Sequence, residues 1–181
     1  MQPELLAQLA PRNARLDAVG GGGRPELTSL DIAAGLAGAP KGGQLAVLAA
    51  YAGQLEMVPE LCERVRMALW RLARAERWRG ITPEPVAVLA RLAVREFVAP
   101  PLCGGCEGRG IQWAPEPRDC EECGGSGSGR VAGSVVCEAL GVQEEEWRGV
   151  WRYRYDKSCA LVSGWSSETL ARLARRLKDD D

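Results

Sequence analysis

The chain has 181 residues, of which 23 are Lys or Arg and 24 are Asp or Glu, so its net charge is −1. A hydrophobic content of 46% and a charged content of 26% are those of a folded globular protein with one ordinary domain or two small ones. The sequence contains no histidine, which excludes Ser-His-Asp triads, His-containing zinc proteases and fingers, and Cys-His nucleophile pairs.

The first part of the chain predicts short helices joined by glycine-rich connectors. Leucines at roughly helical spacing predict a helix over residues 3–16. The four glycines at residues 20–23 lack the lysine and hydroxyl of a phosphate-binding loop, so we interpret them as a flexible connector. A capping-box-like spacing at residues 28–31 predicts a second short helix that ends before residue 40, and residues 44–53 predict a third.

An arginine-rich amphipathic helix is predicted over residues 59–79, with apolar residues along one face. From Arg64 to Arg79 six arginines stand against Glu76 alone, which is a local balance of +5. Because the whole chain is nearly neutral, any binding of nucleic acid must depend on local clusters of this kind. A solvated helix face is the simpler explanation, and the sequence leaves both interpretations open.

The next predicted helix has a clear beginning and end. Thr82 suits the N-cap, Pro83 the first helical position and Glu84 the first turn. We expect the helix to run to about Phe97, because the prolines at residues 100–101 stop it. The residues expected on its buried side are Val86, Leu89, Leu92, Ala93 and Phe97.

A repeated cysteine motif is the most specific feature of the sequence. Cys103-Gly-Gly-Cys106-Glu-Gly-Arg-Gly and Cys120-Glu-Glu-Cys123-Gly-Gly-Ser-Gly are CxxCxGxG units at a period of 17 residues. Two residues between cysteines form a tight turn that points both sulfurs inward, and the glycines permit positive φ. Four thiolates match tetrahedral Zn²⁺ and leave no position for a catalytic water. We therefore predict one structural zinc, bound by Cys103, Cys106, Cys120 and Cys123, in an insertion at residues 100–129.

Other roles for the seven cysteines fit the pattern less well. A thioredoxin-like redox pair needs a βαβ unit and only one CxxC, and the paired glycine-flanked turns favour zinc over an iron–sulfur cluster. Cys62, Cys137 and Cys159 have no spaced partners, and we expect them to be small core residues. The sequence shows no secretory signal and no apolar stretch of about 18 residues, so we expect a reducing, cytoplasmic location and no membrane partner.

Residues 131–155 fit a helix-turn-helix. With the turn glycine at Gly141, the small residue Cys137 lies four positions earlier, and apolar residues fall where two crossed helices share a buried seam. The second helix, residues 143–155, would then be the recognition helix, although a plain helical hairpin gives the same pattern. The predicted seam consists of Val136, Leu140, Val142, Trp147 and Val150.

Basic and polar residues in and around this second helix are the candidate DNA contacts. The acidic run Glu144–Glu146 suits the positive end of the helix dipole but repels phosphate, so DNA binding would depend on its neighbours. The candidate DNA-binding residues are Arg130, Gln143, Arg148, Arg152, Arg154 and Lys157.

A last helix is predicted to begin at residues 163–168. From Arg148 to Lys178 eight basic residues face Asp156 and Glu168 alone, a balance of +6. We interpret the closing residues 179–181, all aspartate, as a solvated tail. The residues expected to face inward are Leu170, Leu173, Ala174 and Leu177.

These elements predict a mainly α fold in two parts. Residues 1–80 form a helical N-terminal region, and residues 81–181 form a DNA-binding helix-turn-helix unit with the zinc insertion inside it. The helix at residues 83–97 would be the first of a three-helix unit, followed by the two helices around the turn. The expected contacts join Leu89, Leu92 and Phe97 to Leu140 or Trp147.

The order of these parts resembles the antitermination protein Q family, which governs late-gene transcription in lambdoid phages. The likeness covers roughly residues 27–165 and depends on four features. These are the block Leu27-Thr-Ser-Leu-Asp-Ile-Ala-Ala-Gly-Leu-Ala-Gly, the paired CxxCxGxG units just ahead of a helix-turn-helix, the block Ala139-Leu-Gly-Val, and the spaced aromatics Trp147, Trp151, Tyr155 and Trp165.

The resemblance implies a protein that binds double-stranded DNA within a late promoter and engages a promoter-proximally paused, σ-containing bacterial RNA polymerase holoenzyme. It would then travel with the polymerase in the host-cell cytoplasm and make it ignore terminators. Carried onto this chain, the four paired cysteines bind zinc and the helix at residues 143–155 reads DNA. The acidic run Glu144–Glu146 departs from a DNA-reading helix and leaves polymerase or σ as its alternative partner. The DNA target, the polymerase surface and the oligomeric state stay open.

A second class of function also fits the cysteines. DnaJ-type chaperones carry the same units, so the alternative is a zinc module that binds unfolded peptides or another protein partner. Such a module needs an apolar groove, and a chain without histidine lacks the His-Pro-Asp of a J-domain. Neither a paired-carboxylate metal site nor a nucleophile–base pair is recognisable, so we expect no enzymatic activity.

Overall fold

The structure is a computed structural model that describes residues 36–113 and 116–179. The predicted helix at residues 3–16 and the connector at residues 20–23 lie outside the described residues, as does nearly all of the helix predicted after residues 28–31. The elements in chain order are α3 (Lys41–Tyr51), the 3₁₀ turn η2 (Leu55–Met57), α4 (Val58–Ala75), α5 (Pro83–Val98), β1 (Ile111–Trp113), β2 (Pro117–Asp119), α6 (Gly133–Leu140), α7 (Glu144–Glu146), the π-helical turn η3 (Trp147–Trp151) and α8 (Arg152–Asp179).

The described chain is mainly helical, which confirms the predicted fold class. The single sheet of the described residues has two strands, β1 and β2, which pair antiparallel with Ile111 opposite Asp119 and Trp113 opposite Pro117. Within residues 36–113 and 116–179, no helix combines the length and apolarity that a membrane crossing requires.

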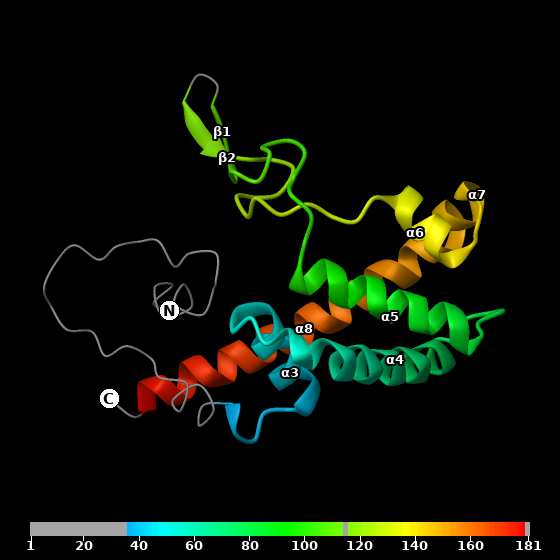
Figure 1. The fold of residues 1–181 in the computed structure, drawn as a ribbon, viewed down its shortest axis with the longest axis horizontal. Coiled ribbons are helices and arrows are strands. Elements are labelled where there is room, and N and C mark those ends of the chain that lie inside the picture. The colour runs from blue at the N-terminus through cyan, green and yellow to red at the C-terminus, as the bar shows by residue number, and fades with distance from the viewer. Residues whose placement is uncertain (1–35, 114–115, 180–181) are drawn as a thin grey trace, which may run out of the picture.

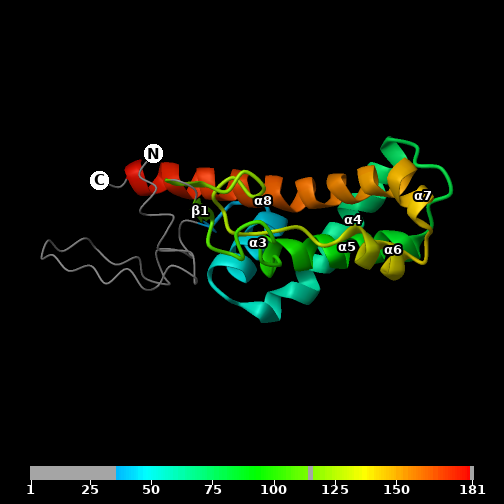
Figure 2. The ribbon, with the colours of Figure 1, turned by 90° about the horizontal axis from the view of Figure 1, so that it is seen from above.

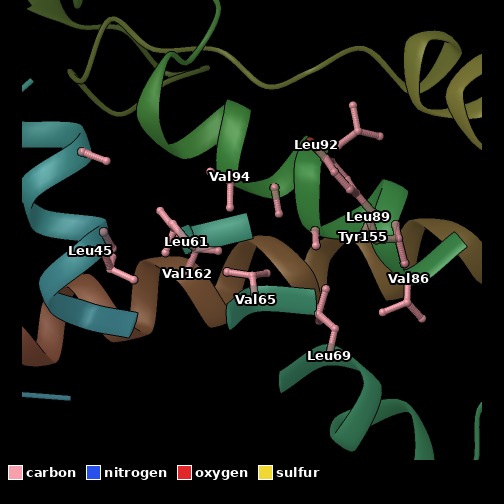
Figure 3. Packing of buried hydrophobic residues seen from close by; sticks show 14 of the residues in the cluster. Leu45, Leu61, Val65, Leu69, Val86, Leu89, Leu92, Val94, Tyr155 and Val162 are labelled. Atoms are coloured by element: carbon pink, nitrogen blue, oxygen red, sulfur yellow. The ribbon is translucent and has the colours of Figure 1, made fainter. Parts of the chain in front are cut away.

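The helices pack around α8, which is the longest of them. α3 and α5 both lie against α8, and α4 packs beside α5 (Figures 1 and 2). One hydrophobic cluster joins all four helices through buried side chains such as Leu45, Leu61, Leu89 and Val162 (Figure 3). Residues before and after position 80 thus share one core, while the domain boundary expected at that position stays a prediction.

α4 ends at Ala75, so the prediction that this helix continues to residue 79 was wrong. Arg77 adopts the left-handed conformation, with φ of 53°. The N–H of Trp78 donates to the carbonyl of Ala73 at 2.8 Å and that of Arg77 donates to Arg74 at 3.2 Å. These two bonds make a Schellman motif, which usually places glycine at the left-handed position. Because an arginine occupies this position, the sequence did not indicate that the helix ends here.

The turn between α6 and α7 matches its prediction. Gly141 is left-handed, with φ of 67°, and the N–H of Val142 closes α6 by donating to the carbonyl of Cys137 at 3.1 Å. α5 packs on α6, and the residues expected to join them belong to the same hydrophobic cluster. Of the predicted seam, Val136, Leu140 and Trp147 belong to this cluster, whereas Val142 is half-buried outside it and Val150 is 45% exposed.

The chain from α7 to the end of α8 is one continuous helical rod, so the prediction of a separate last helix was wrong. The expected start at residues 163–168 lies inside α8. A glycine such as Gly164 costs about 1 kcal/mol in a helix interior, and packing offsets this cost because α8 buries a stripe of residues from Tyr155 to Leu173. The stripe comprises Tyr155, Ser158, Val162, Ser166, Thr169 and Leu173.

α3 and α8 approach closely because α3 carries glycine at the contact. A Cβ added at Gly43 would lie 2.0 Å from the Thr169 hydroxyl oxygen and 2.9 Å from the backbone oxygen of Trp165. No real Cβ tolerates a backbone oxygen at that distance without movement of the helix. Gly43 therefore sets the separation of α3 from α8.

Two glycine-to-alanine substitutions test this packing. Gly164→Ala should stabilise the protein by about 1 kcal/mol, because Gly164 lies within α8 with open space beside it. Gly43→Ala should destabilise it by about 1–3 kcal/mol through overpacking. Thermal unfolding measures both. A Gly164→Ala variant with no gain in Tm would contradict a continuous α8.

Candidate metal centre

The two cysteine units form an arm that leaves the helical body. We call residues 101–129 the cysteine arm; it runs from the end of α5 towards α6 and carries β1 and β2 at its far end (Figure 1). The arm has its own small core, made of the four cysteines of the repeat and separate from the helical cluster. Its order therefore depends on whatever joins those cysteines.

The four sulfurs converge with the spacing of a tetrahedral metal site. The Sγ atoms of Cys103 and Cys120 are 3.9 Å apart, those of Cys106 and Cys123 are 3.7 Å apart, and all four lie within 4.8 Å of one another. A tetrahedron with metal–sulfur bonds of about 2.3 Å has sulfur–sulfur edges of about 3.8 Å. The side chains that the sequence predicted as ligands are thus arranged so that they could hold one metal ion.

The two units are held together by reciprocal hydrogen bonds. The N–H of Cys103 donates to the carbonyl of Gly127 at 2.9 Å, and the N–H of Cys120 donates to the carbonyl of Gly110 at 2.8 Å. Each pair repeats the other after a shift of 17 residues. The units therefore face each other about an approximate twofold axis, which explains why the motif occurs twice.

The last glycine of each unit has no room for a side chain. A Cβ at Gly110 would lie 2.4 Å from the carbonyl oxygen of Gly125, and one at Gly127 would lie 2.4 Å from that of Gly108. Both glycines also have positive φ, 76° and 70°. The CxxCxGxG spacing thus encodes backbone-to-backbone contact between the units as well as the turn geometry.

Backbone amides point at two of the sulfurs. The N–H of Gly110 donates to Cys106 Sγ at 3.2 Å, and that of Gly127 donates to Cys123 Sγ at 3.3 Å. Burial raises the pKa of Cys103 to about 12. Burial also acts to raise the pKa of Cys123, but the Gly127 amide and the neighbouring thiols outweigh it and hold the pKa at about 7. A bound cation would favour the thiolate form at all four positions.

The ligand set restricts what a metal could do here. Four cysteines fill a tetrahedral shell, so a bound ion would hold the arm together and would have no open position for a substrate. Among the described residues this is the one cluster of potential ligands that converges. Cys62 and Cys159 pack instead against the helical core, as predicted from the sequence, and Cys137 is half-buried on α6.

A carboxylate ties the returning end of the arm to the helices. Glu96 of α5 accepts hydrogen bonds from the Tyr155 hydroxyl and from the N–H of Val131, both at 2.7 Å. Arg130 forms ion pairs with Glu96 at 3.2 Å and with Asp156 at 2.8 Å. Burial and the bond to Glu96 raise the pKa of Tyr155. The arm is thereby fixed to α5 and α8 where it enters α6.

Two of the candidate DNA-binding residues, Arg130 and Arg154, are held in networks of contacts within the protein. Arg130 belongs to the Glu96 network. Arg154 is only 6% exposed, lies over the rings of Trp78 and Trp151 at 5.4 and 4.6 Å, and donates to the carbonyl of Arg79 at 2.8 Å. Such burial leaves Arg154 unable to reach phosphate in this conformation.

Of the other four candidates, three lie at the start of the helical rod and Lys157 follows them. Gln143 caps α7 in a capping box with Glu146. Arg148 pairs with Glu144 one turn earlier, and Arg152 is exposed with no partner within the described part of the chain. Lys157 pairs with Glu76 of α4's end at 3.2 Å.

The contacts of Lys157 and Arg154 show that the segment after α4 lies next to this helix, a proximity that the sequence did not predict. Tyr153 and Lys157 both donate to the carboxylate of Glu76, so the arginine-rich segment after α4 lies against the start of α8. Both views show the turn between α4 and α5 at the same end of the molecule as α7 (Figures 1 and 2). We call this end, with exposed Arg77, Arg79, Arg148 and Arg152, the basic end.

The sequence contained a partial signal for the basic end. The excess of arginine from Arg64 to Arg79 was visible, but the contact spans about 75 positions along the chain and has no local signature. Comparison of the chain with models of known protein families finds no match, and comparison with curated proteins finds no relative. The resemblance to the antitermination family therefore stays a prediction.

Loss of one sulfur should unfold the arm and spare the helices. Cys103→Ser should reduce bound metal from one ion per chain to none and expose the arm to trypsin at Arg109, while the helical circular dichroism signal persists. Cys137→Ser is the matched control and should keep its metal, because Cys137 lies outside the cluster. Full metal content in Cys103→Ser would refute the site.

Proposed function

We propose that the chain is a zinc-containing, sequence-specific DNA-binding antitermination factor for phage late genes. It would load onto a promoter-proximally paused, σ-containing RNA polymerase and carry it through terminators. The observation that supports this most is the order of parts: a four-cysteine arm joins directly to a helical hairpin that turns at Gly141. That order is the one on which the resemblance depends.

The metal in this proposal is one structural Zn²⁺. Zinc accepts four thiolates in a tetrahedron without a preference imposed by d electrons, and it undergoes no redox change in a reducing cytoplasm. The sulfur–sulfur distances of 3.7 and 3.9 Å suit it. Because the arm has no other core, zinc would supply the free energy that orders it.

DNA contact in this proposal involves the basic end. Arg148 and Arg152 lie four residues apart, so they share one side of the helix, and Arg77 and Arg79 come from the neighbouring turn. Arg130, Arg154 and Lys157 would position this surface through their internal contacts. The exposed run Glu144–Glu146 repels phosphate, so the side of the helix would meet the DNA backbone rather than its tip.

The alternative, a peptide-binding zinc module, has less support. A cavity of about 390 Å³ in the described structure is lined by Glu168, by short residues 37–39 and by the arginines of the end of α8. Unfolded peptides need an apolar groove, and four of the seven residues that line this cavity are charged.

Charge reversal within one helix tests the DNA surface. Arg152→Glu should weaken binding to late-promoter DNA about tenfold or more and flatten the dependence of log K on log salt by about 0.9 per lost phosphate contact. Arg175→Glu makes the same charge change in α8 about 35 Å away and should bind like wild type. Equal losses in the two variants would contradict a local DNA surface and indicate only net charge.

Transcription in vitro tests the activity. On a template with a late promoter followed by a terminator, wild-type protein should increase readthrough by purified holoenzyme, and Arg152→Glu should lose that effect because it cannot load. A template with a scrambled promoter-proximal segment is the control. Readthrough that is equal on both templates would contradict loading through DNA.

A further inference from the structure

The far end of the cysteine arm carries an exposed apolar face. In the antiparallel pair of β1 and β2, Ile111, Trp113, Pro117 and Asp119 lie on one side of the ribbon. Trp113 is 68% exposed and Pro117 is exposed as well. An indole placed in water at the end of a protruding ribbon costs hydrophobic free energy unless a partner covers it.

The described residues, 36–113 and 116–179, leave this face uncovered. The arm leaves the end of α5 and extends away from the helices (Figure 1), and its cysteine core is separate from the helical cluster. Reciprocal bonds between the two cysteine units and the pairing of β1 with β2 support the ribbon that carries Trp113. An exposed aromatic side chain on such a support is typical of the central contact in a protein interface.

The charge of the arm indicates the kind of partner. Residues 101–129 contain five acidic and two basic side chains, a net charge of −3, and a divalent ion with four thiolates would make it −5. Such an arm is repelled by the phosphates of nucleic acid and attracted by a basic protein surface. Its base also lies about 24 Å from the basic end, because α5, with 16 residues, separates the two.

We propose that the cysteine arm is a protein-docking element: Trp113 enters an apolar pocket on a basic surface of the RNA polymerase holoenzyme, while the basic end holds DNA. This inference rests on the proposed function and adds to it which part of the chain meets the polymerase and by what chemistry. The acidic side chains around the ribbon accelerate and orient the encounter, and the indole supplies most of the affinity.

Binding to purified holoenzyme without DNA, measured by biolayer interferometry, tests the docking. Trp113→Ala should weaken binding about tenfold or more, and Glu116→Lys, beside the ribbon, should weaken it and reduce its salt dependence. Leu55→Ala and Glu56→Lys are the matched controls, because both side chains are exposed on η2 within the helical body. All variants should keep one metal ion and wild-type affinity for promoter DNA.

The outcomes separate the inference from the proposed function. Unchanged polymerase binding by Trp113→Ala, with wild-type readthrough, overturns the docking element and leaves the antitermination proposal standing. A loss of DNA affinity in Trp113→Ala with intact polymerase binding overturns it in favour of nucleic acid as the occupant. Wild-type protein that binds neither polymerase nor promoter DNA overturns both.

Discussion

The buried stripe of α8 is the interaction on which the remaining structure depends. Residues from Tyr155 to Leu173 return to the same side at steps of three and four, and α3 and α5 pack against them. Three members of the stripe are Ser or Thr, whose small side chains let helices approach closely, as Gly43 does from α3. The stripe also fixes Tyr155, which holds Glu96 and through it the end of the cysteine arm. The packing of the helices and the attachment of the arm therefore depend on each other.

The sequence predicted best those features whose cause is local. The cysteine spacing, the Gly141 turn and the start of α5 at Pro83 each follow from a few adjacent residues, and the structure contains all three. Prediction from the sequence failed where contacts between distant residues determine the structure. The polar members of the α8 stripe gave no apolar signal, so a single helix was predicted as two, and the end of α4 has Arg77 where glycine is usual. The burial of Arg154 depends on partners from a distant part of the chain.

In the described molecule, the two ends of α5 differ in the charge of the residues around them and in what they support. Its first turn lies beside the exposed arginines, and its last turn supports an acidic arm that a metal would stiffen. In the proposed function, the exposed arginines would meet nucleic acid and the acidic arm would meet a second protein, with α5 holding the two apart. The cation–π contacts of Arg154 with Trp78 and Trp151 join the segment after α4 to the start of α8, and so hold the exposed arginines of both in place.

The π-helical turn at Trp147–Trp151 affects how the first residues of the helical rod are oriented. Each residue in this wider turn advances by less than the 100° of an α-helix, which swings Val150 out into solvent although its spacing suggested burial. Such a turn is how a helix absorbs one surplus residue without breaking. Deleting or adding a residue there would rotate Glu144–Glu146 by about 100° about the helix axis, while the buried stripe of α8 kept its register. The direction in which these three carboxylates point can therefore change without a change in the packing of α8.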